Sequence, residues 1–242
     1  MKTLGILAAC LIFAAPVVHA DSAGAYIGYG AWRHDPLGSV RYQGGDINVD
    51  DDLGLSAKTD AFAWVTIEHP VPLLPNFRFQ YNKVSLTGQG SGNFTFGGSA
   101  FSGDVSTDGR MDQYDATMYY QVLDNWVNFD LGVNIKRIDG NLTLTGSGAR
   151  ESKNFTATLP MLYANALFNL PFTGLSAGVE GSHIQYDNNT VSDYRAKLSY
   201  QWNGGLGLEG GWRHQQFKLD NADDVNADVK VKGPFLDLFY HF

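Results

Sequence analysis

Apolar and polar residues alternate with a period of two along most of this chain. The clearest stretch is "VNFDLGVNIK", residues 127–136, in which five apolar side chains alternate with polar residues or glycine. Successive side chains of a β-strand point to opposite faces, so this pattern predicts strands. Ten stretches follow it: 24–33, 59–69, 77–86, 111–122, 127–136, 156–169, 175–186, 192–202, 206–218 and 233–242.

The last stretch, "GPFLDLFYHF", keeps the alternation to the final residue, whereas the ends of soluble domains usually fray. A terminal strand that stays ordered indicates a sheet that closes on itself there. The connections between the strands alternate in length. Short ones fall at 70–76, 123–125, 170–174 and 203–205, and longer ones at 34–58, 87–110, 138–155, 187–192 and 219–228. Aromatic residues collect near strand ends, at Trp32, Trp126, Tyr186, Trp202, Trp212 and Tyr240.

Short turns on one side, long loops on the other, aromatic girdles and an even number of strands are typical of outer-membrane barrels. Lipid offers the backbone no hydrogen-bond partner, so a spanning sheet has to close. A soluble sandwich would also alternate, but its polar face would be rich in Lys and Glu. We therefore predict an all-β fold, a transmembrane antiparallel up-and-down β-barrel of about ten strands, located in the bacterial outer membrane.

The first residues predict export from the cytoplasm. Lys2 precedes an apolar stretch, and small residues precede a cleavage point after Ala20. We expect residues 1–20 to be a signal peptide and 21–242 to form the barrel. "LAAC", which ends at Cys10, resembles the lipobox of lipoproteins, but the apolar region continues beyond it to Pro16. Cleavage after Ala20 would leave a mature chain without cysteine, and hence without disulfides or thiolate metal ligands.

Composition narrows the classes of partner. Charged residues make up 17% of the chain, below the roughly 25% of soluble domains. The formal net charge of -8 argues against binding to nucleic acid. No run of some twenty apolar residues follows Ala20, so we expect no transmembrane helix. No phosphate-binding loop, nucleophile elbow or metal-spaced histidine cluster occurs, and we expect no cofactor and no metal.

The polar face of the predicted strands carries ions of both signs. The lumen-facing polar residues that we predict are Glu68, Arg78, Asp115, Asp130, Lys136, Glu180, Arg195, Lys197, Glu209 and Arg213, with Asp237 on the terminal strand. Buried charges need partners, and a barrel of about eight strands is just filled by its side chains. An interior plugged by ion pairs is favoured, and a narrow polar pore is the alternative. We thus expect a structural or narrow-channel barrel whose outer loops bind a ligand.

A catalytic site at the outer rim is a second possibility. His183, Asp187, Asp193 and His214 stand near the predicted outer ends of their strands, where a lipid or peptide hydrolase could place them. Omptin proteases also use ten strands with Asp and His at the rim, but this chain lacks their paired-Asp and Asp–His spacing. We do not expect an enzyme.

Two long connections are acidic, and one is rich in Gly and Ser. The acidic segments are 46–54 and 220–228, in which carboxylates could bind calcium but lack the spacing of an EF-hand loop. Solvated loop charge is the favoured interpretation. Residues 87–109 predict a flexible loop or a protruding hairpin.

A family resemblance follows from three segments together. The proline-rich turn "IEHPVPLLPN", residues 67–76, the signal peptide and the terminal "GPFLDLFYHF" resemble a proteobacterial outer-membrane β-barrel family. That family is named for its co-occurrence with the GlyGly-CTERM/rhombosortase system. The resemblance implies a barrel of unassigned function, with no catalytic residues to carry over, and suggests a partner in protein export or surface sorting.

The terminal strand carries a second resemblance. Its alternation and its aromatic last residue, Phe242, resemble the signal that the barrel-assembly machinery recognises. The partners that we expect are therefore this machinery, membrane lipid and lipopolysaccharide, and no nucleic acid.

Overall fold

The computed structural model describes residues 23–242 apart from 72, 147 and 223, and the predicted signal peptide with Cys10 lies outside them. The chain forms twelve strands: β1 Gly24–Tyr42, β2 Ile47–Asn48, β3 Lys58–Glu68, β4 Asn76–Asn82, β5 Gly88–Phe96, β6 Ser99–Leu123, β7 Val127–Gly146, β8 Ala149–Asn169, β9 Leu175–Tyr186, β10 Asn189–Gln201, β11 Leu206–Ala222 and β12 Val225–His241. The described residues include no helix that is long and apolar enough to cross a membrane.

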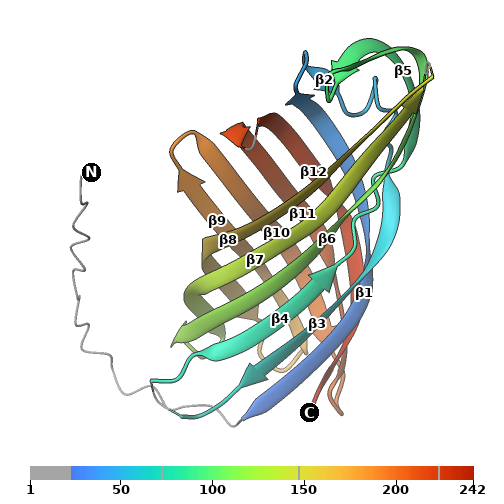
Figure 1. The fold of residues 1–242 in the computed structure, drawn as a ribbon. Helices are drawn as coiled ribbons and strands as arrows, with labels where there is room; N and C mark the ends of the chain where they lie inside the picture. Colours follow the sequence, from blue (N-terminus) through green and yellow to red (C-terminus); the bar gives the residue numbers. More distant parts are fainter. Residues whose placement is uncertain (1–22, 72, 147, 223) are drawn as a thin grey trace, which may run out of the picture.

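All of these strands except β2 and β5 form one antiparallel ring (Figure 1). Neighbours along the chain pair in the ring, and β12 returns to β1. That closing seam runs from Tyr26 opposite His241 to Tyr42 opposite Val225. The Phe242 amide also donates to the Ala25 carbonyl at 2.9 Å, so the chain is paired to its last residue. The ring of ten strands and the closing role of the terminal strand are both as predicted.

Alternate residues of each ring strand face lipid or lumen. On β12, Leu236 and Leu238 are more than half exposed on the outside, whereas Phe235 and Asp237 are buried inside. The outward apolar belt on β7 ends where Arg137 and Asp139 form an exposed ion pair. An ion pair on the outward face is suited to water rather than lipid, so we place the outer edge of the lipid near these residues.

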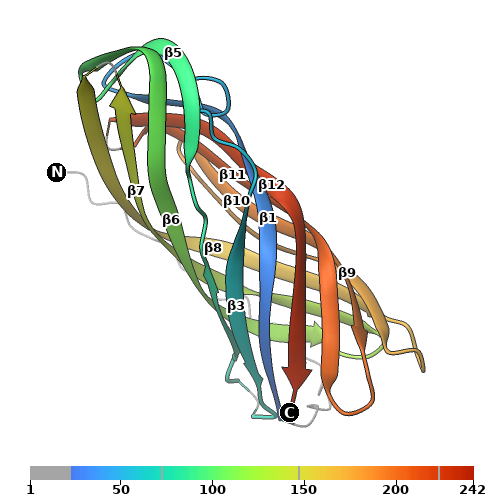
Figure 2. The same cartoon turned by 90° about the vertical axis from the view of Figure 1, so that its right-hand side faces the viewer.

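A closed antiparallel sheet with an outward apolar belt is the architecture of bacterial outer-membrane proteins. The protein is therefore an outer-membrane β-barrel, and the predicted fold and location are confirmed. The four predicted short turns all lie at one end of the ring, together with Gly24 and His241. This end is the periplasmic one, and the long hairpins form the outer end (Figure 2).

Three of the longer predicted connections are largely strand instead. β7 and β8 pair without a break as far as Gly146 opposite Ala149, although residues 138–155 were expected to form a loop. β11 and β12 likewise extend into the predicted loop 219–228. Residues 87–109 form a protruding hairpin of β5 and β6 rather than a flexible loop. Beyond the lipid the outward face of a strand is polar and apolar residues such as Leu144 face inward, so the pattern that marks a lipid-facing strand ends there.

The outer hairpins enclose a second apolar core above the barrel. Ile47, Leu53, Phe101 and Leu144 are fully buried there and come from segments far apart in the sequence. Gly54 lies at the closest approach to β5, where an added Cβ would overlap the Gln89 carbonyl, and its φ of 64° favours glycine. The structure thus carries a packed outer protrusion, formed by residues 43–57, β5 and the outer ends of β6 and β7 (Figures 1 and 2).

Candidate functional site: the filled lumen and the outer mouth

Charged side chains from opposite walls meet in the middle of the lumen. Arg213 on β11 donates to both oxygens of Asp193 on β10, from Nε at 2.9 Å and from Nη2 at 2.6 Å. Lys136, on β7, lies 3.2 Å from the same carboxylate and 2.8 Å from Asp115 on β6. Arg213 also donates from Nη1 to Asn82 on β4 at 2.6 Å. Because β7 and β4 are not neighbours of β10 and β11 in the ring, these contacts span the lumen.

Two glutamines join walls that lie directly opposite each other. Gln113 on β6 and Gln215 on β11 exchange hydrogen bonds of 3.0 Å and 2.7 Å, and both side chains are fully buried. In the ring of ten, β6 and β11 are five strands apart in either direction. A two-fold amide pair at this place therefore bridges the lumen between opposite walls.

A second ionic group lies nearer the periplasmic end. Lys197 donates to Glu180 at 3.0 Å and lies 3.7 Å from Glu209. Arg78 approaches Glu180 at 3.9 Å and lies 4.3 Å above the ring of Trp64. The like-charged Glu180 and Glu209 are thus bridged by one ammonium group, which offsets the cost of burying them.

The remaining predicted lumen residues also face inward. Glu68 accepts a hydrogen bond from the Tyr119 hydroxyl at 2.7 Å, and Asp130 accepts one from Asn165 at 2.8 Å. Asp237 accepts a bond from Trp64 Nε1 at 2.8 Å. The Arg195 guanidinium lies 6.0 Å from the ring of Phe235. Gln113, Gln215 and Asn82 were not singled out from the sequence, because an uncharged polar residue on a strand carries little signal beyond its place in the alternation.

The lumen also has an apolar wall, which the sequence analysis did not anticipate. Its buried members are Trp32, Phe62, Trp64, Val84, Met111, Ile138, Val231, Phe235 and Phe239. Trp32 was expected in an aromatic girdle, but it lies inside because its neighbour Ala31 faces lipid. The Arg213 guanidinium stacks 4.7 Å from the Trp32 ring. Aromatic side chains therefore pack against the ions and leave little space for water.

The space that remains among these charged groups is small. A void of about 20 Å³ lies among Arg78, Asp115, Glu180 and Arg195. A water molecule needs at least about 10–15 Å³, so this void has room for one. Side chains rather than solvent fill this part of the lumen.

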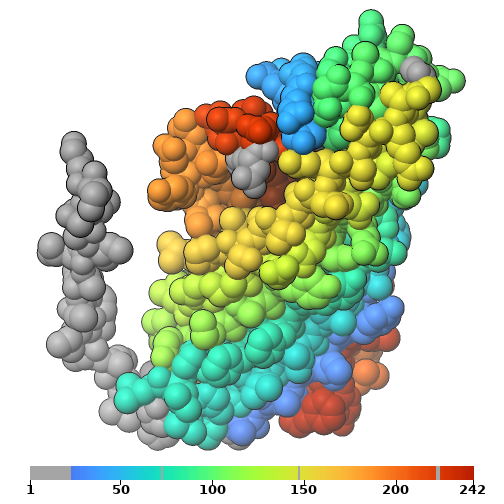
Figure 3. All heavy atoms as spheres, viewed as in Figure 1, coloured from blue at the N-terminus to red at the C-terminus, as the bar shows by residue number. Residues whose placement is uncertain are grey.

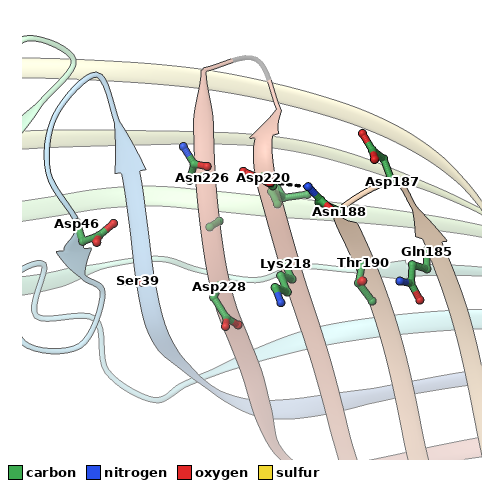
Figure 4. A pocket seen from close by; sticks show the side chains of 12 residues that line it. Ser39, Asp46, Gln185, Asp187, Asn188, Thr190, Lys218, Asp220, Asn226 and Asp228 are labelled. Atoms are coloured by element: carbon green, nitrogen blue, oxygen red, sulfur yellow. Dashed lines mark hydrogen bonds between the residues drawn. The ribbon is translucent and has the colours of Figure 1, made fainter.

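A polar pocket of about 460 Å³ lies at the outer ends of β9 to β12 and β1, mostly on the outward face of the wall, and we call this rim the outer mouth (Figure 4). Its carboxylates are Asp46, Asp187, Asp220 and Asp228, and Lys218 supplies a cation. Asn188 donates to Asp220 at 2.9 Å, and Asp46 pairs with Arg41 at 2.8 Å. The two acidic segments predicted separately thus meet at one pocket, with amide and hydroxyl groups between their carboxylates.

The described residues include no group of three or more His, Cys, Asp or Glu side chains arranged to hold a metal ion. In the first acidic segment, the Asp52 carboxylate instead accepts a hydrogen bond from the backbone amide of Asn48 at 2.8 Å. The carboxylate of Asp52 therefore holds its own turn together.

The four residues considered for catalysis do not come together. Asp193 faces the lumen and is bound by Arg213, whereas the adjacent Tyr194 faces outward and its hydroxyl lies 3.1 Å from His183 Nδ1. His214 lies opposite Tyr194 on the outer wall, and Asp187 lines the mouth pocket. The expected approach of Asp193 to the histidines was wrong, because consecutive residues of a strand point to opposite faces.

The sequence matches no known protein family and no curated protein. One similar solved structure is that of Ail, the attachment invasion locus protein of Yersinia pestis, in complex with the heparin analogue sucrose octasulfate. Its TM-score is 0.43 at 11% identity, over 92% of this chain and 100% of that one. A major outer membrane protein from Thermus thermophilus has a TM-score of 0.42 at 13% identity, over 92% and 100%. The transport unit of the autotransporter AIDA-I from Escherichia coli has a TM-score of 0.41 at 12% identity, over 96% and 94%. Likenesses this remote carry no functional information.

Proposed function

We propose that this protein is a non-conducting outer-membrane barrel. Its packed interior keeps the outer mouth and the protrusion rigid, and these bind an external ligand. One observation carries the proposal: hydrogen bonds and ion pairs cross the lumen between opposite walls. A narrow pore would need those side chains to line a continuous water path. Here Gln113 meets Gln215 across the full width, so a path would have to break buried polar contacts.

Conductance in a planar bilayer tests the closed lumen. The purified, refolded barrel should give no resolvable single-channel steps, because the buried contacts leave room for single waters only. Heat-modifiable migration on a gel should establish that the same preparation is folded, so that silence cannot be due to an unfolded sample. Reproducible, ion-selective steps from folded protein would overturn the proposal in favour of the narrow channel.

The outer mouth is the surface that we assign to ligand binding. Its pocket lies within the size range of about 300–1,000 Å³ that is usual for ligand sites. Carboxylates with interspersed amides and hydroxyls suit a ligand that carries amino groups and several hydrogen-bonding groups. The packed protrusion stands beside this mouth and would limit the directions from which a ligand can enter (Figure 3).

Replacement of the pocket carboxylates tests this assignment. Wild-type protein should bind the tetra-amine spermine, and an Asp220→Asn/Asp228→Asn variant should bind it at least tenfold more weakly in calorimetric titration. A matched variant, Asp104→Asn/Asp108→Asn, removes the same charge from the protrusion and should bind as the wild type does. Equal weakening in both variants would mean that only net charge matters and would contradict a built site.

Two sequence-based alternatives remain hypotheses. A rim enzyme would need a catalytic set other than the four residues considered above, which do not converge. A role beside a protein export or surface-sorting system rests on the family resemblance alone. Recognition of Phe242 by the barrel-assembly machinery rests likewise on a resemblance, that of the terminal strand to the assembly signal.

A further inference from the structure

The membrane-facing wall carries a groove of about 890 Å³ over β7 to β11. We call it the wall groove. Small residues on adjacent strands form its floor: Ala164 lies opposite Gly181, and Ala166 and Ala196 lie on either side of Val179. Larger side chains, among them Leu131 and Trp212, stand at its sides. The groove is therefore a depression in the lipid-facing belt.

The outer end of the wall groove lies directly below a break in strand pairing. β8 and β9 pair only from Asn169 opposite Ser176 to Leu162 opposite His183. β8 continues to Ala149 but pairs there with β7 alone within the described chain. Leu162 and His183 both line the groove, so its outer end reaches the point where the two strands separate.

The outward-facing polar side chains of the groove gather at that outer end. The Tyr194 hydroxyl lies 3.1 Å from His183 Nδ1, and His214 is the β11 partner of Tyr194. The Tyr194 ring lies over Gly181, where an added Cβ would overlap it. Farther toward the periplasm, the outward residues of the groove are apolar, among them Phe129 and Val179. This order of an apolar groove with a polar outer end matches an amphiphile whose polar head faces outward.

We propose that the wall groove is a binding site for one lipopolysaccharide molecule, with an acyl chain over Ala164 and Ala196 and its head group at His183, Tyr194 and His214. The groove is continuous with the lipid interface of the barrel, so acyl chains are what surround it. Its polar end is the outer end, which selects the lipid of the outer leaflet. The site is distinct from the ligand-binding mouth and does not depend on the proposed function.

Native mass spectrometry of the refolded barrel with rough lipopolysaccharide tests the site. Wild-type protein should retain one molecule at collision energies that remove all other lipid. Filling the groove with Ala164→Leu/Ala196→Leu should reduce that occupancy at least tenfold. The matched control is Ala31→Leu, which enlarges an exposed, outward alanine on β1 away from the groove. It should retain the lipid as the wild type does.

Two further arms keep the test decisive. Tyr194→Phe removes only the hydroxyl and should weaken retention several-fold in a barrel that still shows heat-modifiable migration, so a folding defect cannot explain the result. Phosphatidylethanolamine in place of lipopolysaccharide should be retained poorly. Equal retention of both lipids, unchanged retention in the filled groove, or a protein dimer in place of the lipid adduct would each overturn the assignment.

Discussion

Asp193→Ala should lower the free energy of unfolding of the barrel by about 3–5 kcal/mol, the usual cost of removing one partner from a buried ion pair. The carboxylate neutralises two cations at once, Arg213 and Lys136, and both are almost fully buried. Lys136 keeps Asp115 as a partner, whereas Arg213 keeps a hydrogen bond to the amide oxygen of Asn82 and its stacking on Trp32 but no carboxylate that it contacts directly among the described residues. Urea unfolding in lipid vesicles, followed by tryptophan fluorescence, measures the loss.

Asp139→Ala is the matched control for this experiment. Asp139 also binds an arginine through two hydrogen bonds, of 2.9 Å and 3.0 Å, but the pair is exposed to solvent. Exposed pairs contribute little, so the unfolding midpoint should hardly move. If both substitutions cost the same, the lumen network would not be the element that stabilises the barrel.

Gly233→Val should prevent closure of the barrel. Gly233 lies on β12 beside β1, and a Cβ at this position would overlap the backbone carbonyl oxygen of Arg33. A backbone atom in a paired strand cannot rotate away as a side chain can. Overpacking in a core usually costs about 1–3 kcal/mol, and we expect a larger loss where backbone must move. The variant should not show heat-modifiable migration after refolding.

Gly45→Val provides the comparison for the closure experiment. No atom lies within 4 Å of a Cβ built at Gly45, so the same change adds the same volume without overlap. This variant should refold as the wild type does. Normal refolding of Gly233→Val would show that the β1–β12 seam can shift to admit a side chain, and would contradict the tight closure described here.

The filled lumen and the closed seam depend on each other. Trp32 on β1 donates from its indole nitrogen to the Gly233 carbonyl at 3.2 Å, and Arg213 stacks on the same ring. The interior network therefore reaches the strands that close the ring. A barrel held in this way has little freedom to open a pore, as the proposed function requires.

The sequence by itself determined the fold, the number of ring strands and the face on which most side chains lie. Lipid outside and packed polar groups inside impose a strict period of two, which is a local property of each strand. The same rule, applied to Asp193 beside the lumen-facing Arg195 and to His214 next to Arg213, would have placed Asp193 and His214 on opposite faces and excluded the rim cluster. Where lipid no longer faces the strands, as in residues 138–155, the outward face becomes polar and the apolar residues lie on the inner face, and strand was taken for loop.

Only the tertiary structure decided which groups meet. Lys136 reaches Asp193, and Gln113 reaches Gln215, across the lumen. Such contacts depend on the tilt and stagger of the closed ring, which no single strand encodes. The meeting of Asp46 with Asp220 and Asp228 at one mouth, and the break between β8 and β9 above the wall groove, have the same origin. Alternation fixes the side of the wall on which a residue lies, but closure fixes the residue that it faces.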